Sequence, residues 1–387
     1  MEVDLFLRDL TIVVGLGAVL AWCSHTLRQP IILGYILSGV VAGPGGLHLI
    51  EDVNFVDAIG RIGVTLLLFL AGITLPPHSL VQLFRQSALV TLGTSAGAFA
   101  AAALFAWVWG FSVSQSALIG LALMYSSTIL VIKLLPTTTL HQRHMGAICI
   151  AILIAQDLMA VILLLFITPE APITGFALLA LPVKGALLVV AAFIVEQYLL
   201  RPMMAKSDRI HEMLQLLSLA WCLGLAKLAH VVGLSYEVGA FIAGIALARS
   251  PLSLFLSEGL KPFRDFFLVL FFFVLGAKLD LIMVPKLLVP AVLLGVLVLV
   301  LKPAMFYVLF RWTGEPKKFC REASLRLGQA SEFSLVIATY AADAGRMSQQ
   351  AAQLVQLTAI ITMVASAYIV VLKCPTPVSS NKKLQRD

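Results

Sequence analysis

Charged residues are scarce in this sequence, and their scarcity excludes a soluble globular protein. Only 12% of the 387 residues are Asp, Glu, Lys or Arg, whereas soluble domains have about 25%. Hydrophobic residues make up 60% of the chain and occur in long runs separated by short segments rich in Pro, Gly and charge. A run of about 20 apolar residues crosses the hydrocarbon core of a bilayer as a helix. We therefore expect an all-α polytopic membrane protein.

Patterns typical of metal, nucleic-acid and enzyme sites are also missing. The five cysteines stand singly, with neither a CxxC pair nor metal-ligand spacing, so we expect unpaired thiols, no metal and no cofactor. The net charge of +7 comes from basic residues that lie mostly in short loops between apolar segments. That distribution is typical of membrane topology, so we expect membrane lipid and no nucleic acid as a partner. No Ser/His or paired-Asp constellation occurs at matching depth, so no enzyme activity is expected.

The apolar runs predict thirteen transmembrane helices. They cover residues 5–24, 30–43, 55–75, 80–109, 113–135, 143–167, 175–199, 209–230, 234–249, 262–280, 285–311, 317–342 and 348–373. Of the 27 Lys and Arg residues, 18 fall on one side of this arrangement, six on the other and three within helices. The positive-inside rule then predicts a cell inner (plasma) membrane protein with its N-terminus outside and its C-terminus in the cytoplasm.

Three segments of the first half recur in the second half at an offset of 204 or 205 residues. The pairs are LGYILSGVVAG (33–43) with VGAFIAGIALA (238–248), LLLFLAGITL (66–75) with LFFFVLGAKL (270–279), and LMYSSTILVI (123–132) with LGQASEFSLV (327–336). Seven helices separate equivalent positions, and because seven is odd the second copy enters the membrane from the opposite face. The sequence therefore predicts the inverted-topology repeats of many secondary transporters.

Two polar clusters occupy equivalent positions in the third pair of segments. They consist of Tyr125, Ser126, Ser127 and Thr128 in the first half and of Gln329, Ala330, Ser331 and Glu332 in the second. Inverted repeats place discontinuous helices near the midplane, where backbone groups face a cavity. We expect two discontinuous crossing helices that are broken at these clusters. Alternatively, Ser and Thr side chains bond back to their own helix and have only a structural role.

A single carboxylate, Asp157, lies near the middle of the apolar run 143–167. An Asp at the centre of a membrane helix costs about 2.5–3.5 kcal/mol, and is retained where it faces a partner or a hydrated cavity. We expect Asp157 to bind a cation and a proton in turn, with the neighbouring Gln156 and the Ser and Thr residues of the first polar cluster as further ligands. The alternative is a carboxylate that only packs or pairs helices.

Lys302 supplies the opposite charge within an apolar run of the second half. The sixth and eleventh predicted helices can both line the crossing point, so we expect an ion pair between Asp157 and Lys302. Glu332, Gln329 and Ser331 are expected to compensate charge beside them. The alternative for Lys302 is a position at the membrane interface.

Specific motifs give the sequence a resemblance to a known family. It contains AQDLMAVILLLF, YSSTILVIKLL, VGAFIAGIALA, PFRDFFLVLFFFVLGAKLDL and GQASEFSLVI. With these motifs and their spacing, it resembles the membrane domain of the Kef-type monovalent cation:proton antiporter-2 family over nearly the whole membrane span. The resemblance implies a sodium/proton antiporter-like fold, potassium or sodium transport against protons, pH homeostasis, and Asp157 as the ion- and proton-binding carboxylate.

The resemblance also implies a homodimer and a division of the chain into functional segments. These are scaffold and dimerisation helices at 1–79 and 209–282, core ion-binding helices at 80–168 and 283–373, a linker helix at 169–208 and a cytoplasmic tail at 374–387. Kef-type chains continue into a cytoplasmic nucleotide-sensing domain, whereas this sequence stops shortly after its last predicted helix. We therefore expect a separate or truncated regulatory domain as a further partner.

Two features depart from the family pattern. Gln156 stands where electrogenic exchangers of this fold carry a second Asp, and one carboxylate trades one proton for one monovalent cation. We therefore expect electroneutral exchange by alternating access, in which protons and cations compete for Asp157. Thr74 and Lys278 stand where the family often has an acid and a small polar residue, so a regulatory or ion-funnel role does not carry over to them.

Two other functions fit part of the pattern. In a gated cation channel, the same carboxylate would sit at a selectivity constriction, and fluxes far above about 10³ per second would favour this function. An organic-anion carrier on a related ten-helix scaffold is disfavoured by the charged residues and the helix count, and flux assays with bile-acid-like solutes would decide. Hydroxyl and carbonyl oxygens suit K⁺ and Na⁺ alike, so the sequence does not select between them.

Overall fold

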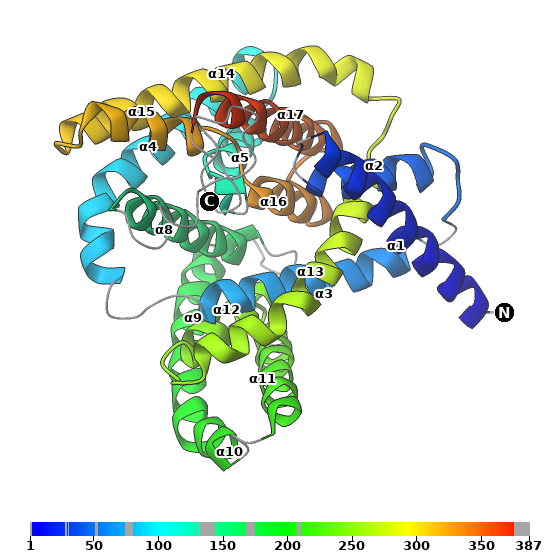
Figure 1. Cartoon of the computed structure of the whole chain (residues 1–387), viewed down its shortest axis with the longest axis vertical. Helices are drawn as coiled ribbons and strands as arrows, with labels where there is room; N and C mark the ends of the chain where they lie inside the picture. Colours follow the sequence, from blue (N-terminus) through cyan, green and yellow to red (C-terminus); the bar gives the residue numbers. More distant parts are fainter. Residues whose placement is uncertain are drawn as a thin grey trace. The chain divides into compact units, whose positions relative to one another are not determined.

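The computed structural model of the chain is all-helical (Figure 1). It describes residues 2–27, 29, 31–50, 53–73, 80–128, 130–131, 144–167, 175–206 and 210–374. The described helices are α1 (Glu2–Thr26), α2 (Ile31–Ala42), α3 (Val53–Ile73), α4 (Leu80–Val108), α5 (Val113–Leu123), α8 (His144–Ile167), α9 (Gly175–Val195), the π-helix η1 (Glu196–Leu200), α10 (Arg201–Lys206), α11 (His211–Val231), α12 (Tyr236–Leu247), α13 (Ser253–Ala277), α14 (Val284–Trp312), α15 (Lys317–Arg326), α16 (Glu332–Asp343) and α17 (Gln349–Lys373). Among the described residues, seven helices are long and apolar enough to cross a membrane.

Most predicted spans coincide with observed helices, and two of the predicted boundaries differ from the observed ones. The helix predicted to begin at residue 262 begins at Ser253, because Pro262 is accommodated inside α13. A proline inside a helix removes one backbone hydrogen bond and kinks or ends the helix, and α13 continues through Pro262. The helix predicted to end at residue 199 continues through η1 into α10. The end of the predicted helix 113–135 lies outside the described residues.

Two predicted spans are interrupted at their polar clusters. In the first half, α5 ends at Leu123, and helical conformation resumes at Thr128 after a non-helical stretch. In the second half, α15 ends at Arg326 and α16 begins at Glu332. We call the non-helical stretches 124–127 and 327–331 the first and second break. Each break frees backbone groups that a continuous helix would pair, so other groups must pair them.

The first of two compact units consists of residues 1–17, 35–80 and 161–278. Within it, α3 packs against both α12 and α13. Glycines permit the close approach: Gly72 of α3 lies against Gly244 of α12, and Gly39 of α2 and Gly276 of α13 each lie against the backbone of the other helix. Small residues at helix contacts are typical of membrane proteins. The repeat pairs Gly39 with Gly244 and Gly72 with Gly276, so the α2–α13 and α3–α12 contacts are equivalent.

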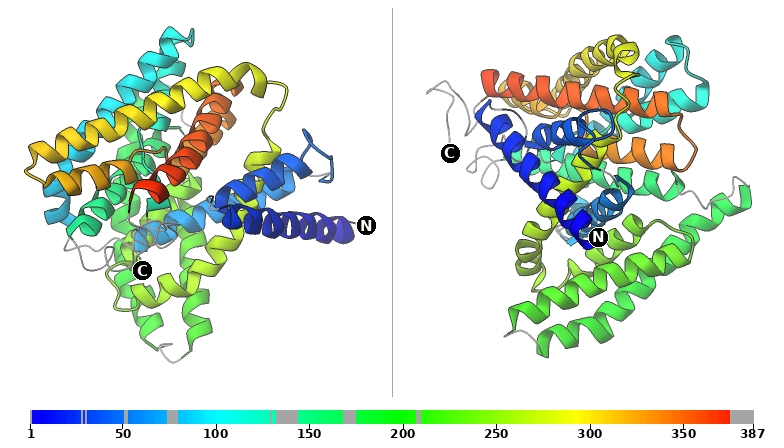
Figure 2. Two further views of the ribbon diagram at one scale, coloured as in Figure 1. Left: turned by 45° about the horizontal axis from the view of Figure 1, so that its top comes forward. Right: turned by 90° about the vertical axis from the view of Figure 1, so that its right-hand side faces the viewer.

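The second compact unit consists of residues 18–34, 81–160 and 279–387. In it, α14 packs along α15 and α17, and α17 also contacts α5 and α16 (Figures 1 and 2). A buried apolar cluster joins α4, α8, α14 and α15 and consists of Val90, Val131, Met145, Ile148, Cys149, Ile152, Leu153, Phe306, Phe310, Cys320, Ala323 and Leu327. This cluster fixes α8 and the helix that precedes the second break in one body.

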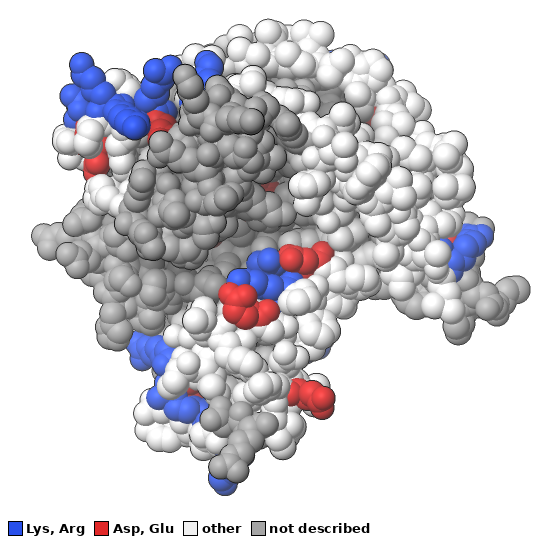
Figure 3. Space-filling model, in the orientation of Figure 1, with Lys and Arg blue, Asp and Glu red and all other residues white. Residues whose placement is uncertain are grey.

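The outer surface of α14 is apolar along one face. Val289, Val296 and Val300 are 59%, 54% and 60% exposed. Such a stripe suits contact with lipid chains. Charged side chains gather in small areas of the face in Figure 3, and one basic area lies over the end of α14 and the start of α15. The exposed basic residues of this segment are Arg311, Lys317, Lys318 and Arg321.

Gly244→Ala is predicted to destabilise the protein, because a Cβ at Gly244 would overlap the main-chain carbonyl of Phe69 and crowd Gly72. Overpacking of this kind costs about 1–3 kcal/mol. The control is Gly224→Ala in α11, where a Cβ has nothing within 4 Å. Thermal unfolding in detergent should give a lower Tm for Gly244→Ala and an unchanged or higher Tm for Gly224→Ala. Equal Tm values would contradict the close approach.

Candidate functional site

The ammonium group of Lys302 joins the two breaks. Lys302 lies on α14 and is 1% exposed. Its Nζ donates hydrogen bonds to the main-chain oxygens of Tyr125, at 2.7 Å, and Gln329, at 2.8 Å. These two carbonyls occupy equivalent positions of the repeat, one in each break. Buried carbonyls released from a helix need a donor, and a charged donor makes the stronger bond.

The expected ion pair between Asp157 and Lys302 is wrong, because these two described residues do not form one. Lys302 turns to the main chain instead. The released carbonyls cannot move away from the break, and leaving them unpaired in the interior would cost about 1–3 kcal/mol each. The charge of Lys302 and its place in an apolar run suggested a carboxylate partner. The main-chain oxygens of the breaks need hydrogen-bond donors, and Lys302 bonds to them instead.

A serine caps the helical segment that follows each break. The Ser127 Oγ accepts a hydrogen bond from the N–H of Leu130 at 3.1 Å. The Ser331 Oγ accepts one from the N–H of Phe333 at 3.1 Å, and Ser331 forms a capping box with Ser334. Serine is a preferred N-cap because its oxygen replaces a missing helical acceptor. The serines that the repeat pairs thus do the same work in both halves.

Asp157 contacts the residue that follows the first break. Its Oδ2 accepts a hydrogen bond from the Thr128 Oγ1 at 3.1 Å, with Oδ1 at 3.4 Å from the same hydroxyl. Asp157 is buried, with 9% of its surface exposed. Glu332 is the equivalent of Thr128 after the second break and is 2% exposed. The first break is therefore joined to Asp157 through Thr128.

The side-chain amide of Gln156 is engaged at both ends. Its Oε1 accepts a hydrogen bond from the main-chain N–H of Ser126 at 2.9 Å, and its Nε2 donates to the Ser95 Oγ of α4 at 3.3 Å. The Ser126 hydroxyl donates to the main-chain oxygen of Leu327 in the second break at 2.7 Å. Hydrogen bonds therefore link α4, α8 and both breaks.

Helix α17 pairs further groups of the second break. The Thr362 Oγ1 accepts a hydrogen bond from the N–H of Ala330 at 3.2 Å, and the Ser366 Oγ donates to the Gln329 Oε1 at 3.1 Å. Thr362 and Ser366 were not predicted from the sequence, although their four-residue spacing on an apolar helix was a usable signal. Ser95 was not predicted either, because nothing distinguishes it within a run of small residues.

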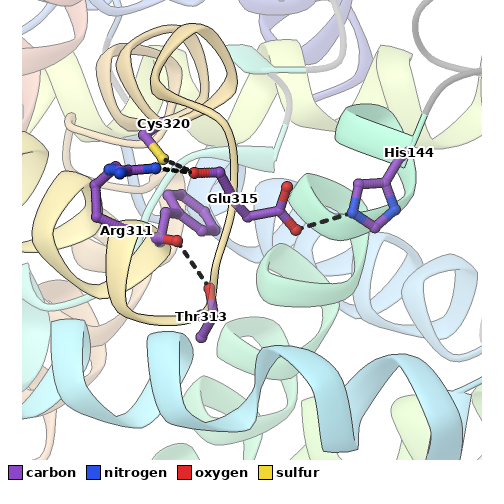
Figure 4. A network of polar contacts seen from close by, with 6 residues as sticks. His144, Arg311, Thr313, Glu315 and Cys320 are labelled. Atoms are coloured by element: carbon purple, nitrogen blue, oxygen red, sulfur yellow. Dashed lines mark hydrogen bonds and ion pairs between the residues drawn. The ribbon is translucent and has the colours of Figure 1, made fainter.

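A polar network holds the turn between α14 and α15 (Figure 4). The Glu315 carboxylate lies 2.9 Å from the His144 Nε2, and the Glu315 main-chain oxygen accepts hydrogen bonds from the Arg311 Nη1 at 2.6 Å and the Cys320 Sγ at 3.4 Å. His144 is the first residue of α8, and the turn leads into α15. The network therefore ties together the ends of the helices that lead to Asp157 and to the second break.

The site offers oxygen ligands and no cluster for a transition metal. The carboxylate of Asp157 and the hydroxyl of Thr128 are hard oxygen donors, which suit hard cations. Among the described residues, no group of three or more His, Cys, Asp or Glu could hold a metal ion. The arrangement can therefore bind either a proton or a small cation at one buried carboxylate.

Lys302→Met is predicted to destabilise the folded protein, because the carbonyls of Tyr125 and Gln329 would lose their donor. The expected loss is about 1.5–3 kcal/mol, the range for hydrogen bonds to a charged group. Lys286→Met, an exposed position at the other end of α14, is the control. Thermal unfolding in detergent measures both variants. A Tm for Lys302→Met that matches the control would refute the bridging role.

Comparison with protein families and curated proteins identifies relatives of the whole membrane region. The family model "Sodium/hydrogen exchanger, transmembrane" matches residues 14–372. The iron transporter MagA of Paramagnetospirillum magneticum is 30% identical over 360 residues, which cover 92% of this chain and 83% of MagA. The glutathione-regulated potassium-efflux system protein KefC of Escherichia coli is 32% identical over 377 residues. That match covers 93% of this chain, which spans 59% of the length of KefC.

Comparison with solved structures agrees on the fold. The sodium proton antiporter MjNhaP1 from Methanocaldococcus jannaschii superimposes with a TM-score of 0.71 at 16% identity, covering 96% of this chain and 97% of that one. The expected sodium/proton antiporter-like fold is thereby confirmed as an all-helical, NhaP1-like fold, and so is the resemblance drawn from the motifs. The chain is a multi-pass membrane protein that belongs to the sodium/hydrogen exchanger family of cation/proton antiporters, with Kef-type proteins among its relatives.

Proposed function

We propose that the protein is a secondary active antiporter that exchanges a monovalent cation, K⁺ or Na⁺, for a proton. The observation that carries the proposal is the buried carboxylate of Asp157, which accepts a hydrogen bond from Thr128 directly after the first break. Family membership supports exchange rather than channel activity. KefC is named a potassium-efflux protein and MjNhaP1 a sodium proton antiporter, so both cations are candidates.

Competition at Asp157 couples the two fluxes. The deprotonated carboxylate binds the cation with the Thr128 hydroxyl and oxygens of the breaks as further ligands, and protonation releases the cation. A bare carboxylate costs several kcal/mol more than a neutralised one in a low-dielectric barrier. The loaded protein therefore changes its access from one side to the other, whereas the empty, charged protein does so poorly.

Exchange is proposed to be electroneutral because a single residue of the pair Gln156–Asp157 can titrate. The amide of Gln156 carries no proton to exchange, and it is already engaged with Ser126 and Ser95. One carboxylate then exchanges one proton for one monovalent cation. The net charge moved in each cycle is zero.

The proposed function also involves a membrane topology, a homodimer and a regulatory domain. We propose thirteen spans in two inverted repeats, in the inner membrane, with the N-terminus outside and the C-terminus in the cytoplasm. The equivalent glycine contacts support the repeats, and the basic end of α14 supports the orientation. We also propose a homodimer. Since the chain spans 59% of KefC, a nucleotide-sensing regulatory domain is proposed as a separate or further part.

Asp157→Asn is predicted to abolish exchange, because an amide cannot alternate between a proton and a cation. Proton flux is measured in proteoliposomes with a pH-sensitive dye, with lithium, sodium, potassium and rubidium added in turn. Asp265→Asn, which changes a 64% exposed carboxylate on α13, should exchange like the wild type. Tm and gel filtration establish that both variants fold. Cation-dependent proton flux that persists in folded Asp157→Asn would refute the role of Asp157.

A further inference from the structure

The residue next to the ion-binding carboxylate has both of its polar groups occupied by protein. Gln156, Ser126 and Ser95 are at most 1% exposed. The amide oxygen of Gln156 accepts the Ser126 N–H, and its amide nitrogen donates to the Ser95 hydroxyl oxygen. A cation ligand would need that oxygen to face the ion, whereas here it faces the backbone of the first break.

The chemistry of these contacts explains why an amide stands at position 156. The Ser126 N–H lies in a non-helical stretch and needs an acceptor, since an unpaired buried N–H costs about as much as a lost hydrogen bond. The Ser95 oxygen, on the other side, takes a hydrogen from the amide. An aliphatic side chain can make neither bond, and an ionised carboxylate could keep the contact with Ser95 only if the serine hydroxyl became the donor. The amide serves both groups in the arrangement observed.

Ser126 connects the position of the first break to the position of the Thr128 hydroxyl beside Asp157. Thr128, two residues further along, holds the carboxylate of Asp157. The hydroxyl of Ser126 reaches the main chain of Leu327 in the second break. A shift of Ser126 would therefore move the Thr128 hydroxyl relative to Asp157 and disturb the contact between the breaks.

We propose that Ser95 and Gln156 act as a positioning pair that sets the first break, and with it the Thr128 hydroxyl, against Asp157. Ser95 touches neither Asp157 nor Thr128 through any hydrogen bond among the described residues, so it acts through Gln156. The inference rests on the proposed function, since its consequence is the affinity for the transported cation. It also assigns Gln156, expected from the sequence to bind the ion, to positioning.

The test compares Ser95→Ala with Thr94→Val on the same helix. The Thr94 hydroxyl is buried and donates to the main-chain oxygens of Val90 and Thr91 within α4, so its loss leaves the pair intact. Proton flux in proteoliposomes, titrated with K⁺ and with Na⁺, gives the apparent KM and the maximal rate. Ser95→Ala should raise the KM about fivefold, as expected for loss of one hydrogen bond, with the maximal rate within about twofold. Thr94→Val should match the wild type. Equal KM values for the two variants would overturn the proposal.

A double-mutant cycle separates this pair from the proposed function itself. If Ser95 acts through Gln156, Ser95→Ala combined with Gln156→Leu should have the KM and Tm of Gln156→Leu alone, whereas independent effects would add. Additive effects on Tm would overturn the pairing even in a protein that exchanges no cation. A wild-type protein that exchanges neither K⁺ nor Na⁺ would refute the proposed function, and the Tm cycle would still decide the pairing.

Discussion

Every backbone group inside a membrane protein needs a partner, and the two helix breaks are where this requirement is hardest to meet. Hydrocarbon supplies no water to the freed N–H and C=O groups. Side chains from three helices and from the breaks themselves pair these groups. Lys302 of α14 bonds one carbonyl in each break, Gln156 of α8 and Thr362 of α17 each accept one N–H, and the serines of the breaks cap the helical segments that follow. The ammonium of Lys302 is central because it serves both breaks at once.

The same solution produces the proposed ion site. A break that has been stabilised presents polar oxygens inside the protein, where a continuous helix would present apolar side chains. Thr128 follows the first break and donates a hydrogen bond to Asp157, and Glu332 is the equivalent residue after the second break. With Lys302 committed to the main chain, the carboxylate of Asp157 keeps its capacity for a mobile cation or proton.

Much of this could be predicted from the sequence, because membrane helices are marked by long apolar runs and a repeat is marked by a constant offset. The offset of 204 residues pairs Ser127 with Ser331, and both serines cap the helical segments that follow the breaks. The same offset pairs the two breaks. The glycines matched by the repeat also lie at helix contacts, but which helices they bring together was not predicted. The boundary of α13 was missed because Pro262 lies within a helix that neighbouring contacts support.

Side-chain partners were harder to predict, for a physical reason. The opposite charges predicted that Lys302 would pair with Asp157. The freed carbonyls of the breaks compete for the Lys302 ammonium, and this competition cannot be predicted without the positions of the breaks relative to α14. Ser95 is one small residue in a small-residue helix, and its importance depends on which way the Gln156 amide turns. The local sequence pattern predicts where the helices lie. Hydrogen bonds between helices that are distant in the sequence can be assigned only when the three-dimensional structure is known.

In the proposed exchange, one buried carboxylate alternates between one proton and one monovalent cation. Proton and cation fluxes can be counted in the same proteoliposomes while the membrane voltage is clamped at several values. Exchange at Asp157 alone should move one proton for each cation, at a rate that does not change with voltage. Proton movement driven by voltage alone, or more than one proton for each cation, would contradict it.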